Sequence, residues 1–81
     1  MNNLEMINRL KRMDILITMK STGTPIEFAE KLSLSVSTLY DILLEMKELG
    51  APIKYSRICR TYFYEKEGGF NINFEWRDQK D

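Results

Sequence analysis

The 81-residue chain contains no histidine and a single cysteine, Cys59. Histidine is the side chain that most often acts as a general base near neutral pH, so its absence argues against an enzyme. One cysteine cannot form an internal disulfide, and without histidine the usual ligand sets of a structural zinc site are excluded. A lone cysteine is typical of a protein in a reducing cytoplasm, where we expect this protein to be.

Long apolar runs and glycine-rich phosphate loops are also absent. No apolar run is long enough to span a bilayer, and residues 1–14 lack the apolar core of a signal peptide. The acidic residues are scattered, and no glycine-rich loop is present to hold a phosphate. We therefore expect a protein that is not an enzyme, has no catalytic residues, does not associate with membranes, and binds no metal or cofactor.

The chain has no excess of either charge, because twelve basic residues balance twelve acidic ones. A neutral total predicts weaker non-specific attraction to nucleic acid than most DNA-binding domains show. The distribution is uneven, however. Residues 54–60 contain Lys54, Arg57 and Arg60 and no acid, whereas residues 27–53 contain two basic and five acidic residues. Local excess is what a phosphate backbone experiences, so residues 54–60 are a candidate contact for a polyanion.

The N-terminal residues are predicted to form a helix over about residues 3–20. Its inner face is a stripe of apolar residues spaced by four, three and four positions, namely Met6, Leu10, Met13 and Ile17. Gly23 follows this helix and is expected to take the left-handed conformation that ends many helices.

Two further helices are predicted over about residues 25–32 and 36–49. Thr24, Pro25 and Glu27 supply the cap, the proline and the acid of a capping box at the start of the second helix. The third helix has Ser35 as its expected N-cap, Gly50 at its end, and an apolar stripe of Leu39, Ile42, Leu43 and Met46. Two helices joined by about three residues cross steeply, as in a helix-turn-helix unit.

After Gly50 the pattern changes to that of strands, over about residues 53–57, 61–66 and 70–76. The first two strands flank basic residues that are expected at a hairpin tip. The third strand alternates polar residues with four large apolar ones, Phe70, Ile72, Phe74 and Trp76. Such a strand favours either additional core or self-association, and we expect a homodimer formed through it. Residues 1–81 are predicted to be a single α+β domain.

Residues 24–64 resemble the winged helix-turn-helix domains of bacterial regulators, in particular the biotin-repressor-like N-terminal group. The family's helix, turn, recognition-helix and wing motifs are matched here by Phe28-Ala29, Leu32, Ser33-Leu34-Ser35, Thr38-Leu39-Tyr40 and the segment from Met46 to Ile53. The resemblance implies a small winged helix, with three helices followed by a two- or three-stranded antiparallel wing. It also implies a transcriptional regulator that binds double-stranded DNA in a sequence-specific manner.

The resemblance places the third helix in the major groove and the wing on the DNA backbone. The candidate DNA-binding residues of the helix are Val36, Ser37, Thr38, Tyr40 and Asp41, and those of the wing are Lys54, Arg57 and Arg60. Hydroxyl groups can bond base edges or phosphates, and a valine can touch a thymine methyl. Alternatively, Ser37 and Thr38 are ordinary first-turn residues, and Tyr40 is a residue at the edge of the core.

Two residues depart from the family pattern. Ser33 stands where glycine is usual, which predicts a strained or different turn. Asp41 stands where arginine is common, and an acid there is unfavourable beside phosphates. With the neutral total charge, Asp41 keeps an alternative open, a winged-helix module or adaptor that binds proteins and not DNA. Arg9, Lys11, Arg12 and Lys20 are assigned to a solvated face of the first helix.

Overall fold

The computed structural model describes residues 2–66. Three helices precede a two-stranded antiparallel sheet: α1 (Asn3–Thr18), α2 (Pro25–Lys31), α3 (Val36–Glu48), β1 (Ile53–Ser56) and β2 (Thr61–Tyr64). This α+β layout was expected from the sequence and is consistent with a small winged helix. The strand expected over residues 70–76, together with the dimer contact assigned to it, lies outside the described residues.

Capping boxes begin the first two helices. The Thr24 hydroxyl accepts the Glu27 N–H and the Glu27 carboxylate accepts the Thr24 N–H, as the sequence predicted for α2. The same arrangement begins α1, where Asn2 and Glu5 exchange equivalent hydrogen bonds of 2.8 and 3.3 Å. The spacing of Asn2 and Glu5 fits this motif, although it was not anticipated.

All three helices end in the same way, with a residue of positive φ one position beyond the cap. These residues are Lys20 (φ 54°), Ser33 (φ 58°) and Gly50 (φ 106°). In each case the next N–H donates back to the last turn, through Ser21 to Leu16 (2.9 Å), Leu34 to Ala29 (2.9 Å) and Ala51 to Met46 (3.0 Å). The sequence predicted the end of α3 at Gly50 and a strained or different turn at Ser33, where the left-handed conformation is the strain that a β-carbon brings.

The prediction that Gly23 ends α1 was wrong, because Lys20 takes the left-handed position there. Gly23 also has a positive φ of 78°, but it lies in the connection to α2. A β-carbon added at Gly23 would come within 2.5 Å of the Glu27 carboxylate. Glycine is therefore required at this position so that the chain can pass close to the capping box of α2.

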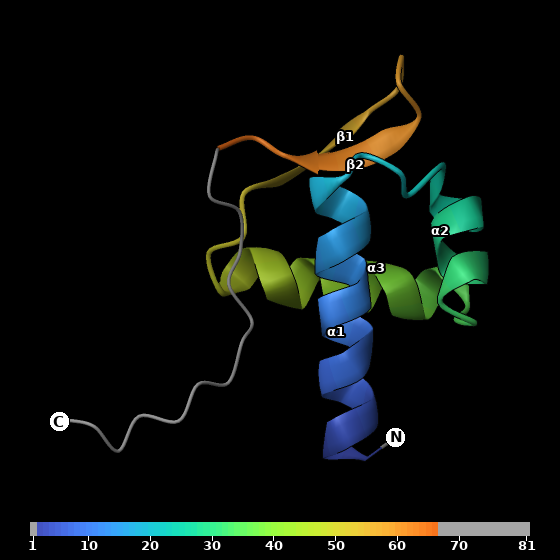
Figure 1. The fold of residues 1–81 in the computed structure, drawn as a ribbon, viewed down its shortest axis with the longest axis vertical. Coiled ribbons are helices and arrows are strands. Elements are labelled where there is room, and N and C mark those ends of the chain that lie inside the picture. Colours follow the sequence, from blue (N-terminus) through green and yellow to red (C-terminus); the bar gives the residue numbers. More distant parts are fainter. Residues whose placement is uncertain (1, 67–81) are drawn as a thin grey trace, which may run out of the picture.

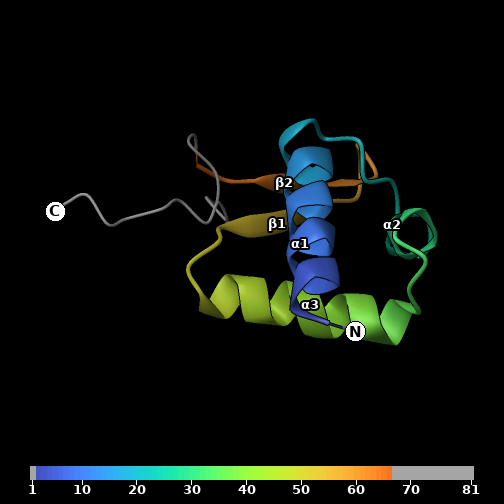
Figure 2. The same ribbon diagram turned by 60° about the horizontal axis from the view of Figure 1, so that its bottom comes forward.

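The helices enclose a single apolar core among the described residues. In Figure 1, α3 runs across α1, and the hairpin lies across the C-terminal end of α1. Figure 2, turned by 60°, shows α2 beside one end of α3. In the same view the hairpin lies toward the end of α1 that is opposite the N-terminus. The core contains the predicted stripe of α3 in full, and its members are Met13, Ile17, Phe28, Ala29, Leu32, Leu39, Ile42, Leu43, Met46, Ala51, Ile53 and Tyr62. No helix within residues 2–66 has the length and apolar character needed to cross a bilayer.

A buried pair of threonines fastens the hairpin to the helices. Thr22, in the connection between α1 and α2, is 0 % exposed, and Thr61 begins β2. The Tyr62 N–H donates to the Thr22 hydroxyl (2.8 Å), the Thr22 N–H donates to the Thr61 hydroxyl (3.2 Å), and the two hydroxyls lie 3.1 Å apart. The α1–α2 connection thus supplies hydrogen-bond partners to the first two residues of β2.

The other end of β2 is fastened to α1 by a second contact. The Tyr64 hydroxyl donates to the Asp14 carboxylate at 2.6 Å. Asp14 is half-buried on α1, between the buried residues Met13 and Ile17. A hydrogen bond to an ionised acceptor is stronger than one between neutral groups, so this contact fixes the strand along α1.

Replacing Thr22 by valine keeps the shape of the side chain and removes its hydroxyl. We expect Thr22→Val to lower the free energy of unfolding by about 1–3 kcal/mol, because the buried Tyr62 N–H loses its acceptor. Urea denaturation measures the change. The matched control is Thr18→Val at the exposed end of α1, which should change stability by less than about 0.5 kcal/mol. Equal losses in the two variants would contradict the role assigned to Thr22.

Candidate nucleic-acid interface

The N-terminus of α3 is closed by a small hydroxyl network. The Ser35 hydroxyl oxygen accepts the Thr38 N–H at 3.1 Å, and the two side-chain hydroxyls are 3.0 Å apart. Ser35 is therefore the N-cap of α3, as predicted. Thr38 is half-buried and its hydroxyl already has a partner in the cap, so less of it is available to a ligand.

The predicted helix residues divide into two groups by exposure. Ser37, Tyr40 and Asp41 lie on the solvent-facing side of α3, with Tyr40 50 % exposed. Leu44 continues the same stripe one turn further along the helix. Val36 is half-buried and packs against the core, so only part of its side chain can meet a partner.

The two strands are joined by a four-residue loop that carries Arg57 and Arg60. The ladder closes with Ser56 opposite Thr61. The Arg60 N–H donates to the Ser56 carbonyl (2.8 Å), and the Cys59 N–H donates to the Ser56 hydroxyl (3.0 Å). Arg60 has a φ of 55°, which lets the loop return to the second strand. Ile58 is 95 % exposed at this tip.

The loop of the hairpin and the N-terminal end of α3 lie on the same side of α1, the side on which α2 packs (Figure 1). Tyr62 packs between α2 and the hairpin, since its ring lies 5.6 Å from that of Phe28 on α2 and 4.9 Å from that of Tyr55 on β1. Burial raises the pKa of Tyr62 to about 12, and electrostatic interactions with Tyr40 and Tyr55 contribute to the shift. One side chain of the core thus joins the hairpin to α2.

The three basic residues of the hairpin have different surroundings. Lys54 and Arg57 are exposed, and no ion pair or hydrogen bond of their side chains is present within residues 2–66. Arg60 is exposed as well. Hydrogen bonding with Thr24 lowers the pKa of Glu27 below its usual value, and the positive charges of Lys31 and Arg60 add to this effect. Among the three, Arg60 is thus the one whose charge acts on a carboxylate of the helices.

The outer face of α3 is acidic, whereas the hairpin is basic. Its charged residues are Asp41, Glu45, Lys47 and Glu48, all exposed. A single lysine in the last turn stands against three carboxylates, so α3 itself offers little attraction to a phosphate backbone. The positive charge of this side of the molecule comes from the hairpin.

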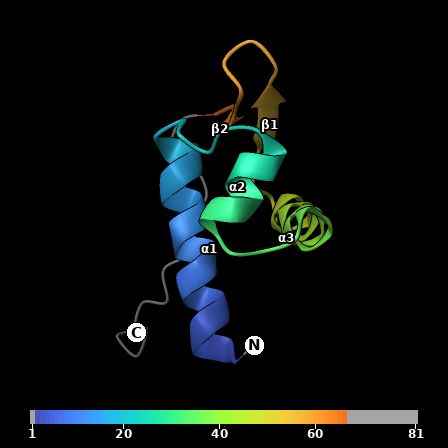
Figure 3. The ribbon, with the colours of Figure 1, turned by 90° about the vertical axis from the view of Figure 1, so that its right-hand side faces the viewer.

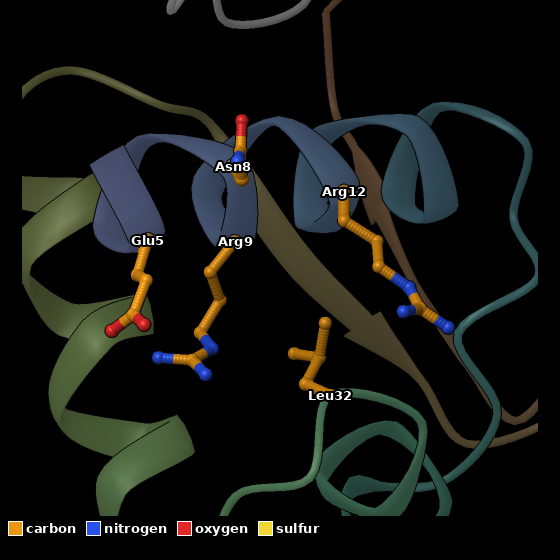
Figure 4. A pocket seen from close by; sticks show the side chains of 5 residues that line it. All are labelled: Glu5, Asn8, Arg9, Arg12 and Leu32. Carbon is orange, nitrogen blue, oxygen red and sulfur yellow. The ribbon is translucent and has the colours of Figure 1, made fainter. Parts of the chain in front are cut away.

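Sequence reasoning missed the residues that position the interface. Thr22 and Thr61 are 39 positions apart, and no local pattern marks them as partners. Arg9 and Arg12 were assigned to a solvated face. Arg12 is exposed, as expected, whereas Arg9 is half-buried, and both line a hollow beside the turn between α2 and α3 (Figure 4). The spacing of three on a predicted helix indicates that the two arginines share a face, but it does not show what lies opposite.

Comparison of the chain with models of protein families, with curated proteins and with solved structures finds no significant match.

A pair of serine variants separates capping from surface contact at the start of α3. We expect Ser35→Ala to lower the free energy of unfolding by about 1 kcal/mol, because the Thr38 N–H loses its cap. The control, Ser37→Ala, removes an exposed hydroxyl that makes no hydrogen bond within residues 2–66, and should change stability by less than about 0.5 kcal/mol. Urea denaturation of both variants measures the difference. Comparable destabilisation by Ser37→Ala would show that Ser37 has a structural role.

The buried tyrosines predict a loss of stability in alkali. The pKa of Tyr62 rises from its ordinary value near 10 to about 12 on folding, mainly through burial. Burial and the Asp14 hydrogen bond raise that of Tyr64 as well. Above pH 10 the folded chain therefore binds more protons than the unfolded chain, so the stabilisation present below pH 10 should be lost as the pH rises through 12.

Urea denaturation at a series of pH values measures this loss. Tyr62→Phe should show a smaller decline between pH 10 and pH 12 than the unaltered chain, because it has one tyrosine fewer to ionise. An identical decline in the two proteins would assign the alkaline instability to other groups.

Proposed function

We propose that the protein is a small winged-helix DNA-binding protein that regulates transcription through sequence-specific contacts to double-stranded DNA. The observation that carries the proposal is that a basic, acid-free hairpin loop and the capped N-terminus of α3 lie on the same side of α1 (Figure 1). A recognition helix flanked by a basic wing is the arrangement that reads a groove while holding the backbone. In a bacterium this function places the protein in the cytoplasm.

In this proposal α3 lies in the major groove with its exposed stripe toward the bases. The Ser37 hydroxyl and the Tyr40 hydroxyl reach base edges or phosphates. Asp41, which repels phosphates, is suited to a different contact, because a carboxylate can accept a hydrogen bond from the amino group of cytosine. The acid that weakens backbone binding thereby contributes to the choice of sequence.

The wing supplies the attraction that the helix lacks. Lys54, Arg57 and Arg60 are exposed and can neutralise phosphates. The homodimer through Phe70, Ile72, Phe74 and Trp76 stays a sequence-based prediction. Two copies related by a two-fold axis would suit a palindromic site.

A second candidate is a winged-helix module or adaptor that binds proteins and not DNA. The acidic outer face of α3 favours it, together with the exposed apolar side chains of Tyr40, Leu44 and Ile58. The two candidates differ in the charge of the partner. DNA is negatively charged, whereas the acidic face of α3 attracts a positively charged protein.

Titration with mixed duplex DNA at several salt concentrations distinguishes the candidates. We expect affinity to fall steeply as salt rises. The double variant Arg57→Ala/Arg60→Ala should flatten the slope of log K against log salt by about 0.9 for each phosphate that the wing no longer neutralises. Fluorescence anisotropy of a labelled duplex gives the affinities.

The control is Lys11→Ala/Lys20→Ala, which removes two exposed positive charges outside the wing. This variant should keep the slope of the unaltered chain. Absence of binding at low salt would sink the DNA proposal and favour the protein-binding module. Equal flattening by both double variants would mean that binding depends on total charge and not on the wing.

A further inference from the structure

The loop at the tip of the hairpin presents an isoleucine almost completely to solvent. Ile58 is 95 % exposed, whereas the next most exposed large apolar residue within residues 2–66 is Leu49, at 73 %. In Figure 3 the loop that carries Ile58 lies at the top, farther from the helices than the strands that it joins. Single exposed apolar residues are common on protein surfaces, so what distinguishes Ile58 is its position and its neighbours.

The loop is braced on both sides of its tip. The Cys59 N–H donates to the Ser56 hydroxyl (3.0 Å), and the Arg60 N–H donates to the Ser56 carbonyl (2.8 Å). Ser56 stands opposite Thr61, which is buried and lies within hydrogen-bond distance of Thr22. An apolar side chain on such a preorganised loop loses little conformational freedom when it enters a partner.

The charges around Ile58 point to a polyanion as this partner. Arg57 and Arg60 lie on either side of it in the loop, Lys54 follows on β1, and residues 54–60 contain no acid. A pocket in another protein can take an isoleucine without these charges. The space between stacked base pairs is apolar and is bordered by phosphates, so it takes both. Proteins that unstack DNA from the minor groove combine basic residues with an apolar wedge in this way.

We infer that Ile58 is a wedge that enters the minor groove and partly unstacks one base step of the bound DNA. The inference rests on the proposed function, in which α3 lies in the major groove and the wing crosses the backbone beside it. Pyrimidine–purine steps such as TA and CA are the easiest to unstack. Ile58 thereby gives the protein a preference for such a step under the wing, without a hydrogen bond to any base.

Fluorescence of 2-aminopurine, an adenine analogue, tests the wedge directly. The analogue is quenched within the base stack and brightens when its stacking is lost. The duplex is one that the unaltered full chain selects from a random pool, and the analogue is placed at successive positions along it. Energy transfer between dyes at the two ends of the same duplex reports its bend.

Three variants separate the wedge from other effects. Ile58→Ala removes the apolar side chain, whereas Ile58→Met keeps one of similar size. Because Ile58 is almost fully exposed, both variants should remain folded, which circular dichroism checks. The matched control is Ile15→Ala, which removes an isoleucine that is 55 % exposed on α1, outside the wing and α3.

With the unaltered chain we expect the fluorescence to rise at one step and the duplex to bend by about 20–90°. Ile58→Met and Ile15→Ala should keep both signals. Ile58→Ala should lose both while keeping the slope of log K against log salt, because Arg57 and Arg60 remain. Replacing the unstacked step by GC should weaken binding of the unaltered chain more than binding of Ile58→Ala.

The outcomes that overturn the wedge differ from one another. If the duplex binds but the fluorescence does not rise, or rises equally with Ile58→Ala, the wedge is wrong and DNA binding stands. If Ile58→Ala flattens the salt slope as Arg57→Ala/Arg60→Ala does, Ile58 only positions the arginines. If the unaltered chain binds no duplex at low salt, the proposed function fails and the wedge fails with it.

Discussion

The hydrogen bonds between Thr22 and the first residues of β2 are the contact on which the arrangement of this small domain depends. A two-stranded hairpin is marginally stable by itself and needs a neighbouring surface. Here the surface is the α1–α2 connection, whose Thr22 is fully buried and takes the Tyr62 N–H. Because the bonds are buried, each group would cost free energy if left without a partner, so they fix both the register and the position of the strand. The wing is thereby held against the helices by a side chain that lies outside every regular element.

Tyr62 extends this constraint to α2. Its N–H is held by Thr22, and its ring packs on Phe28 and Tyr55. A change in the position of β2 would therefore be felt by α2. Tyr62 and the inner residues of α3 belong to one core, so the spacing between the hairpin and α3 is a property of the packing and not of a flexible loop.

Local sequence signals predicted the elements well because their physics is local. The capping residues Thr24 and Ser35 and the apolar stripe of α3 act within a few residues of where they stand. The prediction failed at Gly23. A glycine at this position could serve either to end α1 or to let the chain pass close to Glu27. Only the second applies, and the sequence offers no means of choosing. Lys20 takes the left-handed position although it has a β-carbon, which costs about 1–2 kcal/mol.

The candidate site was predictable in its residue types and less so in its geometry. The basic character of residues 54–60 is visible in the sequence, but the way β2 is fastened to the helices through Thr22 depends on how the hairpin packs. The inward turn of Val36 and the use of the Thr38 hydroxyl in the cap likewise follow from tertiary contacts. Exposure of Ser37, Tyr40 and Asp41, by contrast, follows from their place outside the apolar stripe.

The neutral total charge of the chain is compatible with DNA binding if attraction and selection are carried by different parts of the surface. On the proposed function, the wing provides the positive charge, while the part of α3 that meets the bases presents hydroxyls and the carboxylate of Asp41. Asp41 lowers the affinity wherever it meets a phosphate or a base that cannot donate to it. Most sequences in a genome are of this kind, so the affinity for them is lowered alike. A recognition helix with more acidic than basic residues thus gives up non-specific affinity, which is the part of binding that does not distinguish one sequence from another. On this proposal Asp41 lowers the affinity for most sequences more than the affinity for the correct one, and it thereby contributes to specificity.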